Sequence, residues 1–316
     1  MEFDCGQVDD LLERYYLSPS YAVEFCLGFL GNLLVVLGYA FCLPRWRSIN
    51  VYLFNLAVSD LLFLCTLPRL SYLYANGRSE TNGYACVANR YLLHVNLYSS
   101  ILFMVWVSMD RLLLVTHPAG NHRLLTVRAA LAVTALSWLA VNAQVAPMVV
   151  LMIQDWRGQG NRSLCKDFAS LSGDLDTLGY SAGLTLTGYV LPLVGICVFS
   201  RRIARLLRRQ EGALVRRNAA TYRRSLRVAR AAAAMFLALY TPYHVMRNVR
   251  IASRREWAGL GVCARTYIEA LYMVTRPVAS LHSVINPVFY FLMGDQFREL
   301  LLGKLRQLIR KTNITR

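Results

Sequence analysis

Charged residues are scarce in this chain, and lysine is nearly missing. Asp, Glu, Lys and Arg together make up 17 % of the 316 residues, and apolar residues make up 56 %. Soluble globular proteins carry about 25 % charged residues, so the balance indicates a membrane protein. The chain has only three lysines, Lys166, Lys304 and Lys311, and none lies in a long apolar segment. A retinal protein is therefore excluded, because its Schiff base needs a lysine within the bundle.

Acidic residues are also few, with 18 Asp and Glu against 35 Lys and Arg and a net charge of +17. Such an excess alone would suggest nucleic-acid binding. The arginines instead cluster after the first, third, fifth and seventh apolar segments, most densely between Arg201 and Arg230. This alternation is the positive-inside pattern. It predicts a multi-pass protein of the plasma membrane, with an extracellular N-terminus and no nucleic-acid partner.

Seven apolar segments are long enough to cross a bilayer, which takes roughly 20 residues. We expect spans at about 21–43, 50–74, 86–117, 127–153, 178–199, 228–251 and 267–291. The predicted fold is an all-α membrane protein, a seven-transmembrane helix bundle over 20–293. An extracellular N-terminal tail, 1–19, precedes it, and a cytoplasmic segment, 294–316, follows with a short amphipathic helix 8. No hydrolytic or metal-ligating constellation points to an enzyme.

The seventh span combines a buried charge with a helix-weakening motif. Arg276 lies in its outer half, and Asn286-Pro287-Val288-Phe289-Tyr290 lies near its inner end. A charge inside a membrane span is costly and is by default a functional residue. Pro287 removes a backbone donor and loosens the helix. The span therefore predicts ligand binding near the outside and a conformational response near the inside.

Two other spans carry positive groups at a similar depth. Arg90 and His94 are four residues apart in the third span and share a helix face, and Arg247 lies in the outer half of the sixth. Unpaired guanidinium groups repel one another and lose hydration. A small dianion would relieve both costs, because guanidinium forks match carboxylates. The alternative is internal pairing of these arginines with Glu269 or Asp167.

The predicted outer side contains four of the eight cysteines and a glycosylation sequon. Disulfides persist on that side, and four cysteines allow three pairings. The sequon, Asn161-Arg162-Ser163, predicts a glycan on Asn161. The four outer cysteines are Cys5, Cys86, Cys165 and Cys263.

Landmark motifs occur in order through all seven spans: Gly31-Asn32, Leu56-Ala57-Val58-Ser59-Asp60, Cys86, Asp110-Arg111, Trp138, Pro192, Pro242 and Asn286-Pro287-Val288-Phe289-Tyr290. Each motif alone is weak, but the ordered set resembles the rhodopsin-like (class A) family of G-protein-coupled receptors over essentially the whole chain. A closer resemblance, to the succinate-receptor branch of that family, rests on 52–56, 74–77, 165–170, 241–254 and 284–292.

The resemblance implies a cell-surface receptor that senses extracellular succinate, a small dicarboxylate, and activates heterotrimeric G proteins. Receptors for 2-oxoglutarate or a nucleotide are alternatives. A dicarboxylate transporter is a further one, although the internal repeats common in transporters are not visible. The implied ligand-binding residues are Arg90, His94, Arg247 and Arg276, with Tyr21 and Tyr74 as hydroxyl donors and Asp167 and Phe168 shaping a lid.

The resemblance also implies a switch below the ligand. Asp60 at mid-membrane must be neutralised, hydrated or paired, and the family implies a sodium ion beside it and no other cofactor. We expect Asp110 to hold Arg111 until the G protein docks. The implied sodium and switch residues are Asp60, Ser100, Asn286, Asp110, Arg111 and Tyr290. The resemblance further implies a Cys86–Cys165 disulfide, and we then expect Cys5 to pair with Cys263.

Overall fold

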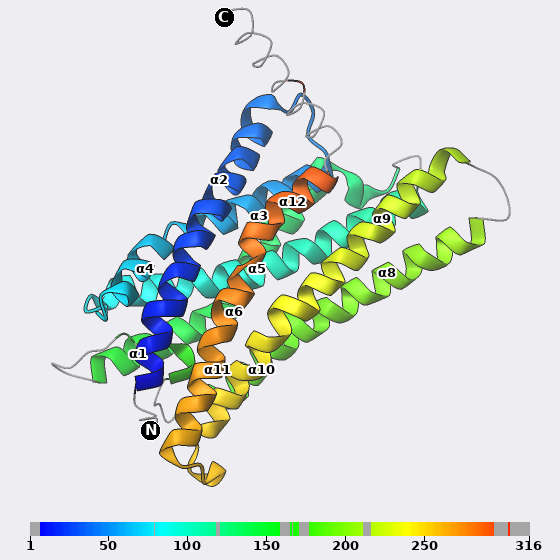
Figure 1. The fold of residues 1–316 in the computed structure, drawn as a ribbon. Helices are drawn as coiled ribbons and strands as arrows, with labels where there is room; N and C mark the ends of the chain where they lie inside the picture. Colours follow the sequence, from blue (N-terminus) through cyan, green and yellow to red (C-terminus); the bar gives the residue numbers. More distant parts are fainter. Residues whose placement is uncertain are drawn as a thin grey trace, which may run out of the picture.

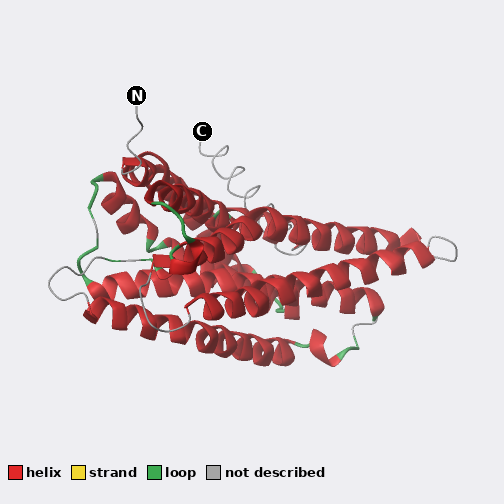
Figure 2. Cartoon of the chain, turned by 90° about the horizontal axis from the view of Figure 1, so that it is seen from below, coloured by secondary structure: helices red, strands yellow, loops and turns green. Residues whose placement is uncertain are grey.

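A computed structural model describes residues 7–78, 80–117, 121–158, 165, 167–170, 177–210, 216–293 and 303. These residues form a bundle of long helices that run alongside one another and are joined at two ends (Figures 1 and 2), and the described part contains no strand. Within the described ranges, five helical segments are long and apolar enough to cross a membrane: Val8–Cys42, Ser48–Ala75, Gly83–Thr116, Val127–Arg157 and Thr177–Arg208.

The observed helices confirm the predicted seven-span bundle. The spans consist of α1 (Val8–Leu12), η2 (Glu13–Leu17) and α2 (Ser18–Cys42); α3 (Ser48–Leu64) and α4 (Leu67–Ala75); α5 (Gly83–Thr116); α6 (Val127–Gly158); α7 (Thr177–Thr185), η6 (Leu186–Val190) and α8 (Leu191–Gln210); α9 (Arg216–Met235), η7 (Phe236–Tyr240) and α10 (Thr241–Ser253); and α11 (Val262–Ser280) and α12 (His282–Met293). Short 3₁₀ turns are η3 (Arg123–Leu125), η5 (Phe168–Ser170) and η8 (Glu256–Ala258). The first helix begins inside the predicted tail, and the predicted helix 8 lies outside the described residues apart from Gly303.

Prolines interrupt the three spans that follow the loop of residues 159–176. The wide π-type turns η6 and η7 directly precede the helices that begin with Leu191-Pro192 and Thr241-Pro242. A proline has no N–H for the carbonyl four residues earlier, so the ladder widens there. In the seventh span Pro277 lies inside α11, Pro287 lies inside α12, and the two helices separate at Leu281. Each of these spans is therefore built from separate helical segments that meet at an irregular turn.

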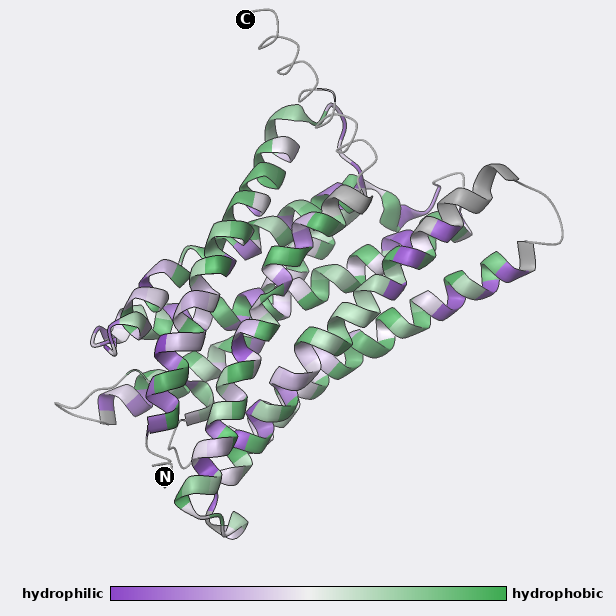
Figure 3. Cartoon of the chain, viewed as in Figure 1, coloured by the Kyte–Doolittle hydropathy of each residue, from purple (hydrophilic) through white to green (hydrophobic). Residues whose placement is uncertain are grey.

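The third span forms the centre of the bundle. Helix α5 packs against α3, α6, α8 and α9, and Ile101, Phe103 and Met104 on it are completely buried. Apolar side chains on the outer face of α2, such as Leu30 and Phe41, are exposed, as expected for a face that contacts lipid. Hydrophilic residues gather toward the C-terminal end of α8 and the N-terminal end of α9 (Figure 3).

A disulfide between Cys86 and Cys165 joins the start of α5 to the loop after α6, with a Cα–Cα distance of 5.6 Å. This confirms the predicted pair, and we refer to this end of the bundle as the disulfide end. Cys263, at the start of α11, is also disulfide-bonded. Its predicted partner Cys5 and the predicted glycosylation site Asn161 lie outside the described residues, so both remain predictions.

Gly188 provides a test of the close packing between the third and fifth spans. A Cβ added at Gly188 would overlap the ring of Tyr98, whereas one added at Gly195 would meet its nearest neighbour, Val105 Cγ1, at 3.9 Å. We expect Gly188→Ala to be less stable than Gly195→Ala by about 1–3 kcal/mol, because overpacking displaces Tyr98. Thermal unfolding of the purified proteins measures this, and equal melting temperatures would contradict the packing.

Candidate functional site

A cavity of ≈ 350 Å³ lies at the disulfide end of the bundle and brings together side chains from five spans and the loop after α6. Four of the predicted ligand-binding residues line it: Tyr74 from α4, Arg90 from α5, Asp167 from the loop and Arg276 from α11. The helices are rotated so that these polar groups face inward, away from the apolar outer faces. Half of the eight predicted ligand-binding residues thus line one cavity, and the other four, Tyr21, His94, Phe168 and Arg247, are not in its lining.

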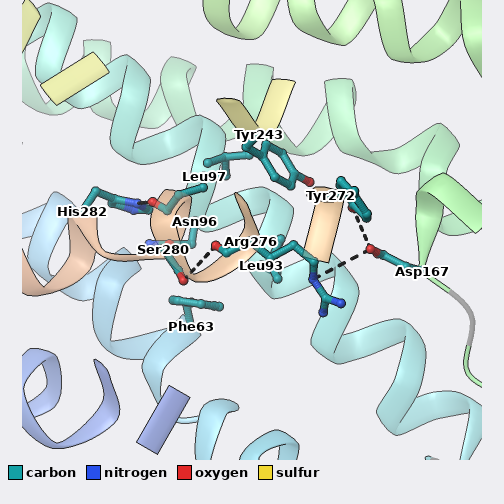
Figure 4. Close-up of a pocket in the computed structure, with 11 residues that line it drawn as sticks. Phe63, Leu93, Asn96, Leu97, Asp167, Tyr243, Tyr272, Arg276, Ser280 and His282 are labelled. Atoms are coloured by element: carbon teal, nitrogen blue, oxygen red, sulfur yellow. Dashed lines mark hydrogen bonds and ion pairs between the residues drawn. The ribbon is translucent and has the colours of Figure 1, made fainter. Parts of the chain in front are cut away.

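Two arginines in this cavity share one carboxylate. Asp167 Oδ1 lies 3.9 Å from Arg90 Nε, and Asp167 Oδ2 lies 3.9 Å from Arg276 Nε (Figure 4). The carboxylate accepts hydrogen bonds from the Tyr272 hydroxyl at 2.6 Å and the Phe168 backbone N–H at 2.9 Å. Burial alone would raise the pKa of Asp167, but Arg90 and Arg276 hold it well below its ordinary range. Asp167 is therefore ionised at neutral pH.

The guanidinium groups retain unused hydrogen-bonding capacity. At 3.9 Å the pairs with Asp167 are Coulombic contacts without a direct hydrogen bond. Nε and Nη1 of Arg90 are buried and find no hydrogen-bond partner in the described part of the chain. Arg276 Nη2 donates to the Tyr74 hydroxyl at 3.2 Å, and the Tyr21 ring, whose centroid lies 6.2 Å from that of Tyr74, stacks on it. Such buried, unmet donors favour an added anion.

His94 contacts the backbone of Arg90, the Tyr243 hydroxyl and the ring of Phe168. Nδ1 of His94 is 2.8 Å from the carbonyl oxygen of Arg90, and Nε2 is 3.3 Å from the Tyr243 hydroxyl. Because a carbonyl only accepts, Nδ1 carries the proton and Nε2 accepts from Tyr243. The Phe168 ring packs edge-on against His94 with centroids 6.1 Å apart. Phe168, the loop residue predicted as part of a lid, therefore contacts His94, a predicted ligand-binding residue of the third span.

Arg247 in α10 is completely buried and is held by neutral groups. Its Nε donates to Ser181 Oγ at 3.1 Å, Nη1 donates to the Tyr98 hydroxyl at 2.7 Å, and Nη2 donates to Thr185 Oγ1 at 3.0 Å and to the Ser181 carbonyl at 3.2 Å. Its guanidinium also lies 5.5 Å from the Tyr243 ring centroid, within cation–π range. Sequence reasoning missed this set. The signal was present as polar residues in the outer halves of the third and fifth spans.

Internal pairing of the arginines is only partial. Glu269, considered above as a partner for Arg276, instead forms an ion pair with Arg250 on the neighbouring helix α10. Among the residues that the structure places, Asp167 is the one carboxylate in an ion pair with Arg90 or Arg276, and none is in an ion pair with Arg247. Arg90 and Arg276 therefore share one ion-paired acid, and Arg247 is held by neutral groups.

Asp60 lies at the centre of a second polar cluster deeper in the bundle. Its Oδ1 accepts from Asn96 at 2.9 Å, Ser283 at 3.0 Å and Ser100 at 3.3 Å, and its Oδ2 accepts from Asn286 at 2.8 Å. The structure thus brings together the predicted Asp60, Ser100 and Asn286. Nε2 of His282, which sequence reasoning missed, lies 3.6 Å from Asp60 Oδ1. The signal for His282 was a polar residue four positions before Asn286 in an apolar span.

The Asp60 cluster has the ligand chemistry of a hard cation. The side-chain oxygens Oδ1 of Asn32 and Oδ1 of Asn286 are buried acceptors with no donor among the described groups. With the Asp60 carboxylate they form an oxygen-rich set, which is the set that hard cations prefer. The residues therefore fit the sodium ion implied by the family resemblance.

The predicted switch residues lie at the end opposite the disulfide end. Asp110, in the last turns of α5, accepts a hydrogen bond from the Ser48 hydroxyl at the start of α3. Ser48 was not predicted from the sequence. The role of Asp110 in holding Arg111 stays a prediction, and the side chain of Tyr290 lies outside the described residues.

Comparison with known proteins identifies relatives along nearly the whole chain. Residues 31–290 match the model of the family described as 7 transmembrane receptor (rhodopsin family). The chain is 43 % identical over 302 residues to succinate receptor 1 of Rattus norvegicus, covering 95 % of this chain and 93 % of the rat protein. It is 43 % identical over 297 residues to succinate receptor 1 of Mus musculus, covering 94 % and 92 %. It is 32 % identical over 313 residues to a purinoceptor of Homo sapiens, covering 98 % and 82 %.

The stacked tyrosines offer a matched test of the site geometry. The Tyr74 hydroxyl accepts from Arg276, whereas the buried Tyr21 hydroxyl has no partner in the described part of the chain. We expect Tyr74→Phe to lower the free energy of unfolding by about 1–3 kcal/mol, because it leaves a buried Arg276 donor unmet. Tyr21→Phe serves as the control and should leave ligand-free stability unchanged. Equal melting temperatures for the two variants would contradict the Tyr74–Arg276 contact.

Proposed function

We propose that this chain, which belongs to the rhodopsin family of seven-transmembrane receptors, is a receptor for extracellular succinate. Members of this family are multi-pass plasma-membrane receptors, not enzymes, and they couple small ligands to heterotrimeric G proteins. The further step, to succinate as the ligand, rests on the charge and hydrogen-bonding of the cavity at the disulfide end that Arg90 and Arg276 line, which we call the arginine cavity. We also propose that the disulfide end and the N-terminus face the outside.

The balance of buried charge carries the proposal. Arg90, Arg247 and Arg276 are each at most 7 % exposed, and Asp167 is the one carboxylate in an ion pair with any of them among the described residues. Three buried guanidinium groups against this one ion-paired carboxylate leave an excess of two; Glu13 also lines the cavity but forms no ion pair with these arginines among the described residues. A dicarboxylate neutralises that excess, and buried charges are tolerated when they are paired and hydrogen-bonded. Succinate carries two carboxylates on a short, flexible chain.

The three arginines contribute to ligand binding in different ways. Arg90 has two unpartnered nitrogen atoms within the described part of the chain, and Arg276 donates a side-chain hydrogen bond to Tyr74. These two can form forked contacts with carboxylates. Arg247 already donates four hydrogen bonds to neutral acceptors. In our proposal Arg247 supplies positive charge on the inner side of the ligand and joins the sixth span to the third and fifth. His94, Tyr21 and Tyr74 border the ligand, and Asp167 and Phe168 cover it.

The size of the ligand limits its affinity. Succinate has about eight non-hydrogen atoms, and ligand efficiencies of roughly 0.3–1.5 kcal/mol per atom give binding free energies of about 2–12 kcal/mol. The middle of that interval, about 4–8 kcal/mol, corresponds to dissociation constants from about 1 mM to about 1 μM, which is the range that we expect. A metabolite sensor functions in that range because it must release its ligand as the concentration falls.

The relative named as a purinoceptor supports a second candidate ligand class, a purine-containing anion. Identity to the two succinate receptors is higher, at 43 % against 32 %. 2-Oxoglutarate also carries two carboxylates, so it would neutralise the same charge excess of two. Comparing succinate, 2-oxoglutarate and a nucleotide as agonists on cells that express the receptor distinguishes the three.

Sodium at Asp60 is the proposed allosteric ion. Asp60 would hold it with Ser100, Asn286 and Asn32, and the ion would supply the positive charge that compensates the buried carboxylate. Asp110 and Arg111 would act at the opposite end, where the G protein docks.

Replacing sodium by choline at constant ionic strength tests the ion site. We expect the melting temperature of the purified wild type to fall when sodium is removed, by about 2–4 °C for each kcal/mol of lost stabilisation. Asp60→Asn removes the charge, so its melting temperature should not respond to the exchange. A wild type that is insensitive to sodium would show that neighbouring groups satisfy Asp60 without a metal.

Arginine substitutions test the ligand site. We expect Arg276→Ala and Arg247→Ala each to lower succinate potency by at least about 30-fold, because each removes a buried charge that faces the ligand. Arg69→Ala is the control, since its side chain is 61 % exposed and is paired with Glu80 on the rim. G-protein dissociation at matched surface expression gives the potency. A normal response from either buried-arginine variant would exclude that residue as an anchor.

A further inference from the structure

Glu24 is a buried acid in the first span that has no role in the functions assigned above. It lies in α2, is 4 % exposed, and its Oε2 is 2.7 Å from the Ser280 hydroxyl of α11. No basic group in the described ranges forms an ion pair with it. An acid inside a membrane bundle is by default a functional residue, and this one contacts the helix that carries Arg276.

The protonation state of Glu24 can be inferred from its contact with the Ser280 hydroxyl, which has a single proton to donate. The Ser280 hydroxyl lies near three acceptors: Glu24 Oε2 at 2.7 Å and the carbonyl oxygens of Arg276 and Pro277, each at 3.2 Å. A serine in a helix commonly donates its single proton to a carbonyl of the preceding turn. The serine has one proton for three acceptors, so when that proton goes to a carbonyl of its own helix, the 2.7 Å contact with Glu24 is made by a proton on the acid. An ionised carboxylate without a cation would carry the large cost of an unpaired buried charge.

The contact between Glu24 and Ser280 is made at the turn of α11 that Pro277 weakens. Pro277 has no N–H, so it cannot bond the carbonyl four residues earlier, and the helix is loosened next to Arg276. The Tyr16 hydroxyl, from the same first span, donates to the Val274 carbonyl at 3.0 Å. The first span therefore supports α11 on both sides of Arg276. In Figure 4, Ser280 lies one turn from Arg276 with its hydroxyl joined to the Arg276 carbonyl.

We propose that Glu24 is a positioning residue for Arg276. As a neutral carboxylic acid it donates a hydrogen bond to Ser280 and fixes the turn of α11 from which Arg276 reaches the anion. The inference rests on the proposed function, because the ligand that Arg276 would bind is succinate. Its distinct content is that a neutral donor at position 24, and not a negative charge, sets the affinity of the site.

The test compares Glu24→Gln, Glu24→Ala, Ser280→Ala and the double variant Glu24→Ala/Ser280→Ala in purified receptor. Succinate affinity is taken from the succinate-dependent rise in melting temperature. Glu24→Ala and Ser280→Ala should each weaken succinate about tenfold, the effect of one hydrogen bond. The double variant should be no weaker than either single one, because the two residues act through one contact. Glu24→Gln keeps a neutral donor of similar size and should bind like the wild type.

Val35→Ala is the matched control, a buried substitution in the same helix, 3 % exposed before the change. It should lower the melting temperature without changing the succinate affinity. The proposal is overturned if Glu24→Gln binds as weakly as Glu24→Ala, or if the two alanine effects add. If the wild type itself does not bind succinate, the proposed function fails. The melting temperatures of the ligand-free variants still test the contact between Glu24 and Ser280. A double variant that loses no more stability than either single alanine variant supports the contact, and additive losses overturn it.

Discussion

The structure depends on keeping more positive than negative charge inside a membrane bundle. Three arginines from the third, sixth and seventh spans are buried at the disulfide end, where water cannot solvate them fully. The chain stabilises them in two different ways. Arg247 is surrounded by hydroxyls, a carbonyl and an aromatic ring, whereas Arg90 and Arg276 share the carboxylate of Asp167. Neither arrangement neutralises the excess, and a fully neutral cavity would have no reason to bind an anion.

The arginine cavity and the Asp60 cluster are separated by a short stretch of the seventh span. A small cavity of ≈ 20 Å³ lies between them and is bordered by Arg276, Ser280, Asn96 and His282 (Figure 4). That volume is about enough for one water molecule. Asn96 and Ser283 donate directly to Asp60. If a ligand on Arg276 displaces α11, the hydrogen bonds that Asn96 and Ser283 donate to Asp60 would therefore change as well.

The sequence was sufficient for the features that depend on one helix at a time. Apolar length located the spans, and charged residues within those spans located Arg90, Arg247 and Arg276. The structure confirmed the bundle and the Cys86–Cys165 pair. Features that depend on how two helices are rotated against each other were not accessible. Glu269 shares a helix face with Arg276 by spacing, yet it pairs with Arg250 of α10. Seven residues of helix separate Glu269 from Arg276 by about 10 Å along the axis, so a side chain on a neighbouring helix can be the nearer partner.

Glu24, Tyr98 and Ser181 were missed for the same reason. Each is an ordinary polar residue by sequence and acquires its importance only through a partner on another span. Periodicity gives the buried face of a helix, but the partner depends on the depth and rotation of its neighbours, which packing decides.

The disulfide has a consequence for how the receptor matures. Cys165 lies two residues before Asp167, so the covalent link to α5 fixes the position of the acid shared by Arg90 and Arg276. Without the disulfide, Asp167 would lose its covalent tie to α5, and Arg90 and Arg276 would lose the support that keeps their shared carboxylate in place. Disulfides persist in oxidising compartments, so oxidation of this cysteine pair completes the charge pattern at the disulfide end.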